Sequence, residues 1–74
     1  MVFEKLKELI NEELGFETSS LTLESTLTDM GADSLDAVEL IMAIEEEYSI
    51  EIAESDAQKF TTLKSIVDYI EANK

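Results

Sequence analysis

The sequence predicts an all-α fold, namely a small antiparallel four-helix bundle with three main helices and one short helix. The periodicity of the apolar residues, the lack of proline and the chain length support this prediction. Apolar residues recur with the 3.6-residue period of a helix, whereas the apolar–polar alternation typical of strands is scarce. The chain contains no proline, and its 74 residues suffice for one small domain. We therefore expect residues 1–74 to form a single helical domain.

The first helix is predicted from about Val2 to Leu14. Its apolar side chains share one side of the helix, which is the pattern of a helix that packs on a core. Gly15 follows at the position where a residue in the left-handed conformation commonly ends a helix. The predicted core side comprises Val2, Phe3, Leu6, Leu9, Ile10 and Leu14.

A long connection, rich in Thr and Ser, runs from Phe16 to Ala32. Apolar residues recur through it, so we expect this segment to pack over the core. These residues are Leu21, Leu23, Leu27 and Met30, and Gly31 ends the connection.

The second helix is predicted from about Ser34 to Tyr48. Asp33 is a favourable N-cap, and Asp36, three residues later, can support the capping interactions. Carboxylates also suit the positive end of the helix dipole. The predicted core stripe of this helix comprises Ala37, Leu40, Ile41, Ile44 and Tyr48.

Two further helical segments complete the bundle. A short helical turn is predicted near Ser55–Lys59, and the last helix should start after Thr61 or Thr62 and run to about Ala72. Its apolar stripe comprises Leu63, Ile66, Val67 and Ile70, with Tyr69 at the edge.

The second helix also carries apolar residues on a side away from its core stripe. This side mixes apolar residues with carboxylates, which are rarely buried without partners, and the segment contains no cation. Such an exposed mixture suits a docking site for a protein partner. Isolated exposed apolar residues are also ordinary, so this pattern alone leaves both interpretations open. The residues are Leu35, Val38 and Met42, with Glu39, Glu45 and Glu46 beside them.

The charge of the chain predicts its class of partner. Eighteen acidic residues face five lysines, the net charge is −13, and no basic residue lies between Glu8 and Gln58. Such a surface repels nucleic acid and anionic membranes, and it attracts proteins with basic patches. The alternative is that the acidic residues only keep a small protein in solution.

Several kinds of site and location are not expected. The chain has no Cys and no His, which removes disulfides and the common zinc ligands, and the acids after Asp29 do not match a calcium loop. No signal peptide precedes the first amphipathic segment, and no apolar run is long enough to span a bilayer. We therefore expect no metal site and a cytoplasmic protein.

Ser34 is the candidate functional residue. A nucleophilic serine needs an activating base, usually His, and the chain has neither His nor a Gly-rich phosphate loop. We therefore expect no enzymatic activity, but Ser34 can still be the substrate of another enzyme. The alternative is that Asp33 and Ser34 serve only as a helix cap.

Three segments resemble acyl carrier proteins. Asp29-Met-Gly-Ala-Asp-Ser-Leu-Asp-Ala-Val-Glu-Leu40 resembles the modification-site signature of that family. Ile41-Met-Ala-Ile-Glu-Glu-Glu-Tyr48 is similar to the family's acidic second helix, and Lys59-Phe-Thr-Thr62 resembles the entry to its last helix. The similarity covers nearly the whole chain and is weakest from Phe16 to Leu27. The chain departs from the family at Ala53, where proline is frequent.

The resemblance implies a carrier of the fatty acid synthesis type. A phosphopantetheinyl transferase would attach a 4′-phosphopantetheine arm to Ser34, flanked by Asp33 and Leu35, and the thiol of the arm would hold acyl groups as thioesters. The protein would act as a monomer, and fatty acid or polyketide synthesis enzymes with basic patches would dock on its second helix. The implied docking residues are Asp36, Val38, Glu39, Met42, Glu45 and Glu46, together with Asp33 and Leu35.

Two alternatives remain open at this point. The first is a specialised carrier for a polyketide, lipid A or other secondary pathway. The second, from a different class, is an unmodified acidic adaptor that binds basic partners.

Overall fold

The computed structural model describes all residues from Met1 to Lys74 and contains four helices. These are α1 (Val2–Leu14), α2 (Ser34–Tyr48), α3 (Glu54–Ala57) and α4 (Leu63–Asn73). The predicted all-α bundle of three main helices and one short helix is confirmed, and the only β-type pairing is an isolated bridge between Thr26 and Thr62. None of the helices has the length and apolar character needed to cross a membrane.

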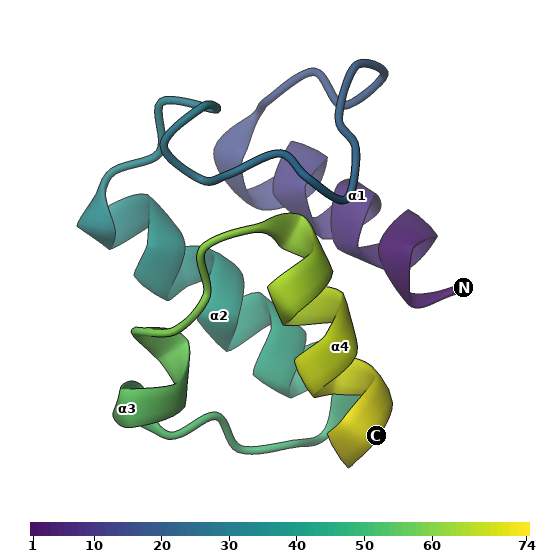
Figure 1. The fold of residues 1–74 in the computed structure, drawn as a ribbon, viewed down its shortest axis with the longest axis vertical. Coiled ribbons are helices and arrows are strands. Elements are labelled where there is room, and N and C mark those ends of the chain that lie inside the picture. Colours follow the sequence, from purple (N-terminus) through teal and green to yellow (C-terminus); the bar gives the residue numbers. More distant parts are fainter.

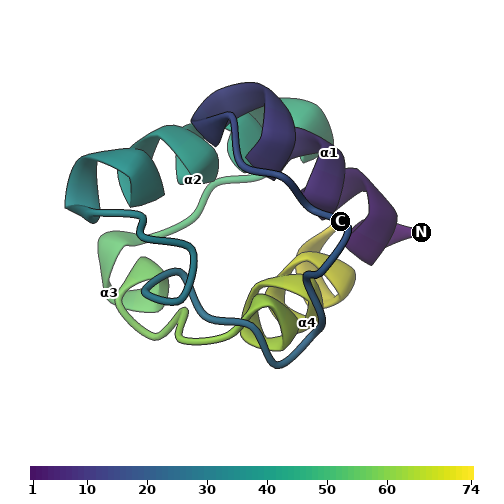
Figure 2. The same cartoon turned by 90° about the horizontal axis from the view of Figure 1, so that it is seen from above.

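The long helices surround one apolar core. α1 packs against both α2 and α4, and α3 lies apart from α1, beside the connection that leads to α4 (Figures 1 and 2). Every buried residue is apolar, and no polar or charged side chain is buried. The core residues that are less than 2% exposed are Leu6, Ile10, Leu40, Ile44, Leu63, Ile66 and Ile70.

The helix ends follow the local signals in the sequence. Gly15 adopts φ 67°, and its N–H donates to the carbonyl oxygen of Asn11, which ends α1 as predicted. At the start of α4, the Thr62 and Ser65 side chains each accept a hydrogen bond from the other's backbone N–H, at 3.2 Å. These interactions satisfy backbone groups that a helix end otherwise leaves unpaired.

The connection between α1 and α2 crosses one end of the bundle (Figure 1). Two hydrogen bonds attach it to the first turn of α4, from Leu63 N to Ser25 O at 2.9 Å and from Lys64 N to Leu23 O at 2.8 Å. Met30 is buried and Leu21 and Leu27 are half-buried, as expected for a connection packed over the core. The Leu23 side chain is exposed, because here the backbone carbonyl and not the side chain makes the contact.

A tyrosine of α4 connects α3 to the bundle. α3 has no fully buried residue, but the Tyr69 hydroxyl donates to Asp56 Oδ2 at 3.2 Å, and the Tyr69 ring meets the Phe60 ring edge-on at 5.4 Å. Burial and the hydrogen bond with Asp56 raise the pKa of Tyr69 above its usual value. The observed helix begins one residue before the predicted turn and ends at Ala57, because no side chain caps its start and local signals are weak there.

Candidate functional site

Ser34 is the first residue of α2, and its side chain is exposed. The turn before it is ordered by hydrogen bonds: Gly31, at φ 73°, donates from its N–H to Thr28 O at 2.9 Å, and Ala32 N donates to Leu27 O at 3.1 Å. Asp29 N also donates to Thr26 Oγ1 at 3.0 Å. The hydroxyl of Ser34 is therefore held at the end of an ordered loop and the start of a long helix.

Asp33 and Asp36 form a reciprocal cap around this serine. Asp36 N donates to Asp33 Oδ1 at 2.9 Å, and Asp33 N donates to Asp36 Oδ2 at 3.3 Å. Both carboxylates thus lie at the positive end of the α2 dipole. The cap that the sequence predicted is made by these two acids, and Ser34 contributes no side chain to it.

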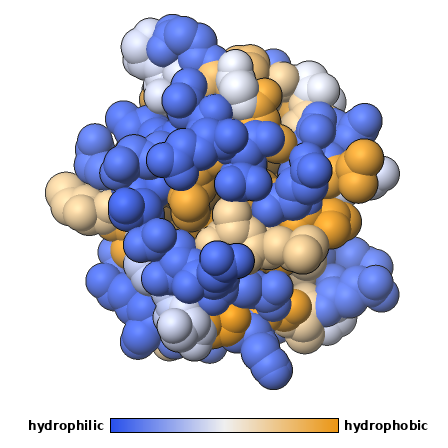
Figure 3. Space-filling model, turned by 180° about the vertical axis from the view of Figure 1, so that it is seen from behind, coloured by the Kyte–Doolittle hydropathy of each residue, from blue (hydrophilic) through white to orange (hydrophobic).

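Three apolar side chains of α2, which we call the α2 strip, remain exposed: Leu35 at 67%, Val38 at 51% and Met42 at 60%. The buried residues of the same helix, Leu40 and Ile44, face the core. Figure 3 shows the face behind the view of Figure 1, where apolar patches lie among hydrophilic side chains. Glu39 and Glu46 are exposed as predicted, and together with Met42 they also line a groove between α2 and α1.

Glu45 differs from the other predicted docking residues. Its side chain is half-buried, and its Oε2 accepts a hydrogen bond of 2.7 Å from the backbone N–H of Ile52. One oxygen of this carboxylate therefore ties the end of α2 to the segment before α3. Sequence reasoning missed this contact because no local pattern links residues seven positions apart across a turn.

The surroundings of Ser34 fit a covalently attached arm. The hydroxyl is exposed, and the nearby hydrogen bonds of the helix start are made by Asp33 and Asp36. A Cβ built on Gly31 would meet no atom within 4 Å, so the turn beside the serine is open. A group joined to Ser34 Oγ would therefore displace no core side chain and break no cap.

Comparisons with known proteins agree with this geometry. The family model described as "Phosphopantetheine attachment site" matches residues 4–70. A curated relative, the "Acyl carrier protein" of Clostridium acetobutylicum, is 47% identical over 74 residues, which cover 99% of this chain and 96% of the relative. The match therefore includes all three long helices as well as the segment around Ser34. The chain belongs to the acyl carrier protein family, whose members carry a phosphopantetheine attachment site.

Proposed function

We propose that Ser34 is the residue to which the 4′-phosphopantetheine arm of this carrier is attached, and that the protein serves fatty acid synthesis. The main support is the position of Ser34: an exposed hydroxyl, outside the hydrogen bonds of its own helix cap, next to the α2 strip. When bound, the arm supplies a thiol that can hold an acyl group as a thioester. The chain has no cysteine of its own for this purpose.

The protein's own residues present the serine and recruit its partners. The Asp33–Asp36 cap fixes the backbone of the first turn of α2, so that the Ser34 side chain leaves the helix at a defined position. We expect the transferase to supply the base that removes the hydroxyl proton, because the chain has no His, the side chain that most often does so. The surrounding carboxylates attract basic patches of the partner enzymes, and the α2 strip supplies the apolar contact.

The experiment that tests the attachment site compares two serine variants, Ser34→Ala and Ser20→Ala. Each protein is incubated with a phosphopantetheinyl transferase and coenzyme A and analysed by intact mass spectrometry. We expect wild type and Ser20→Ala to gain the mass of one arm, and Ser34→Ala to gain none while its circular dichroism stays helical. Loading of Ser34→Ala would refute the assignment, and a wild type that is never loaded would favour the acidic adaptor.

The pathway is tested by the cargo of the native protein. The acidic second helix and the Gly31-Ala-Asp-Ser-Leu35 segment favour the fatty acid type over a specialised carrier. The mass of the arm on protein purified from its source should correspond to fatty acyl intermediates of increasing length. Polyketide or hydroxylated lipid A precursors in their place would support the specialised alternative.

We further propose that this carrier works as a monomer in the cytoplasm and has no catalytic activity of its own. The net charge of −13 opposes association between copies, and the chain has no His, the residue that usually activates a nucleophilic serine. Size-exclusion chromatography with light scattering should give the mass of one chain. Turnover of an acyl thioester by the purified protein alone would contradict the non-enzymatic role.

A further inference from the structure

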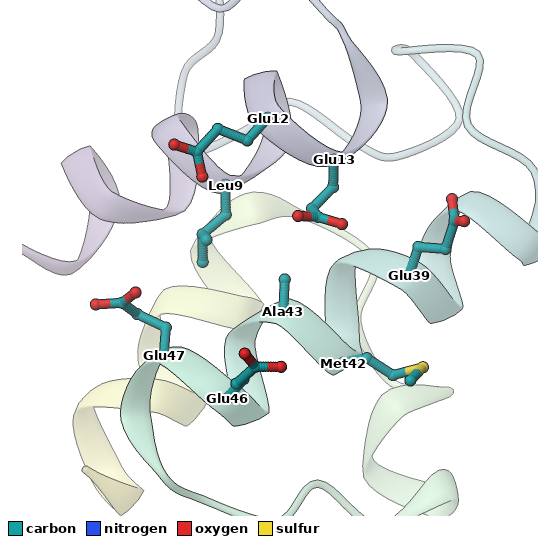
Figure 4. Close-up of a pocket in the computed structure, with 8 residues that line it drawn as sticks. All are labelled: Leu9, Glu12, Glu13, Glu39, Met42, Ala43, Glu46 and Glu47. Carbon is teal, nitrogen blue, oxygen red and sulfur yellow. The ribbon is translucent and has the colours of Figure 1, made fainter.

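A groove of about 480 Å³ lies between α1 and α2. Leu9 of α1 and Ala43 of α2 face each other within it, with Met42 at its side, and carboxylates from both helices surround them (Figure 4). The residues of this α1–α2 groove are Leu9, Glu12 and Glu13 from α1, and Glu39, Met42, Ala43, Glu46 and Glu47 from α2.

The fold does not neutralise the carboxylates of this groove. Only Glu47 has a cation within 4.0 Å, which is Lys5 Nζ at 3.9 Å. Glu12 and Glu13 lie in the last turn of α1, and Glu46 and Glu47 lie in the last turn of α2, where neither helix has a basic residue. Negative charge is unfavourable at the C-terminal end of a helix dipole, so Glu12, Glu13 and Glu46, which have no ion pair, do not stabilise their helices.

The arrangement of the carboxylates indicates which cation fits. No three acidic side chains of the chain are grouped closely enough to hold a metal ion. The groove instead combines apolar atoms of Leu9, Met42 and Ala43 with carboxylates spread around them. This combination suits an arginine or lysine side chain, whose alkyl stem packs on apolar surface while its charged head bonds carboxylates.

The groove is also continuous with the α2 strip, because Met42 belongs to both. Ala43 follows Ser34 by nine residues on the same helix, which corresponds to about 14 Å along its axis. An enzyme that attaches the arm must bring its active site to the Ser34 hydroxyl itself, because no arm is yet present to bridge a gap between the two proteins. An interface of ordinary size that includes Ser34 would also cover the groove, about 14 Å away along the helix.

We propose that the α1–α2 groove receives an arginine or lysine side chain of the phosphopantetheinyl transferase, so that α1 forms a second wall of the docking surface. The inference rests on the proposed attachment at Ser34. According to this inference, Glu12 and Glu13 of α1 also determine which enzyme binds. The transferase then recognises the groove formed by both helices rather than α2 alone.

The test compares two double variants that remove the same charge. Glu12→Gln/Glu13→Gln changes the groove, and Glu24→Gln/Glu51→Gln changes two exposed carboxylates outside it that lack an ion pair. We expect the groove variant to lower kcat/KM for loading with coenzyme A by about fivefold, mainly through KM, and to weaken its dependence on salt. The control should stay within about twofold of wild type.

The melting temperature of the groove variant distinguishes a docking role of Glu12 and Glu13 from a structural role. The groove variant should melt at the same temperature as wild type or higher, because it removes charges that oppose the α1 dipole. A lower melting temperature together with slower loading would indicate a structural role and overturn the inference. Equal loading of both double variants would also overturn it, whereas absence of loading in wild type would refute the proposed function instead.

A cross-linking experiment identifies the occupant directly. The chain has no cysteine, so in protein that does not yet carry the arm Glu13→Cys introduces a unique thiol, to which a photoreactive group can be attached. With the transferase present, we expect cross-links next to arginine or lysine residues of that enzyme, and fewer of them from Glu24→Cys. Cross-links only to acidic or apolar regions of the transferase, or none above the control, would contradict the proposal.

Discussion

At the scale of single residues, Glu45 illustrates how one side chain can look like a docking residue and also stabilise the fold. The sequence places it among the carboxylates of the second helix, but its Oε2 accepts the N–H of Ile52 at 2.7 Å. Ile52 is itself a buried core residue, so its backbone lies where water has little access. Loss of the acceptor would leave this N–H without a partner, which is costly.

We therefore expect Glu45→Ala to lower the free energy of unfolding by about 1–3 kcal/mol. Glu45→Gln keeps an acceptor oxygen and should cost clearly less, while removing the same charge. Urea denaturation followed by circular dichroism measures both variants. Equal stability of the two would show that the hydrogen bond to Ile52 contributes little. The contribution of the Glu45 charge to partner binding should be measured with Glu45→Gln, because this variant keeps an acceptor for the Ile52 N–H.

At the scale of the helix, α2 has two apolar sides with different roles. Leu40 and Ile44 are almost fully buried in the apolar core, whereas the α2 strip is more than half exposed. The cap of Asp33 and Asp36 fixes where the helix begins and thus where Ser34 points. One helix thereby joins the core, the candidate attachment residue and the candidate docking surface.

The two sides should respond differently to substitution. Leu40→Ala removes buried atoms and should destabilise the fold by about 2–5 kcal/mol. Val38→Gln/Met42→Gln changes exposed positions and should alter stability by no more than about 0.5 kcal/mol per site, yet slow loading of Ser34 by the transferase. Thermal melts and loading kinetics measure the two effects. Unchanged loading with the strip replaced would exclude it as a contact surface.

At the scale of the whole molecule, negative charge far exceeds what the lysines can neutralise. Lys5, Lys7, Lys64 and Lys74 each form ion pairs, and these reach only five of the eighteen acidic side chains. The pairs lie at the surface, where each contributes little to stability. The remaining carboxylates repel one another, which is a cost of keeping an acidic surface for basic partners.

Screening this repulsion should stabilise the fold. We expect added salt or Mg²⁺ to raise the melting temperature by about 4–8 °C, which corresponds to about 1 kcal/mol for a domain of this size. Calorimetry across a salt series measures the shift. A melting temperature that does not change between low salt and added Mg²⁺ would show that the carboxylates interact more weakly than their number suggests.

The features that depend on neighbouring residues could be predicted from the sequence alone. The bounds Val2–Leu14 and Ser34–Tyr48, the Gly15 cap and the Asp33–Asp36 cap follow from periodicity and from side chains within four positions of each other. The family resemblance around Ser34 was likewise readable from contiguous residues. The role of Ser34 stays a prediction, which the loading of Ser34→Ala and Ser20→Ala tests.

The contacts between residues far apart in the sequence are visible only in the folded structure. The hydrogen bond of Glu45 to Ile52, the attachment of Leu23 O to the start of α4 and the side-by-side placement of Glu12 and Glu13 with the α2 carboxylates all join separate segments. No period or motif encodes such contacts, because they follow from how the helices pack around a shared core. The sequence therefore identified the serine and its helix, and the packing of α1 against α2 formed the groove beside them.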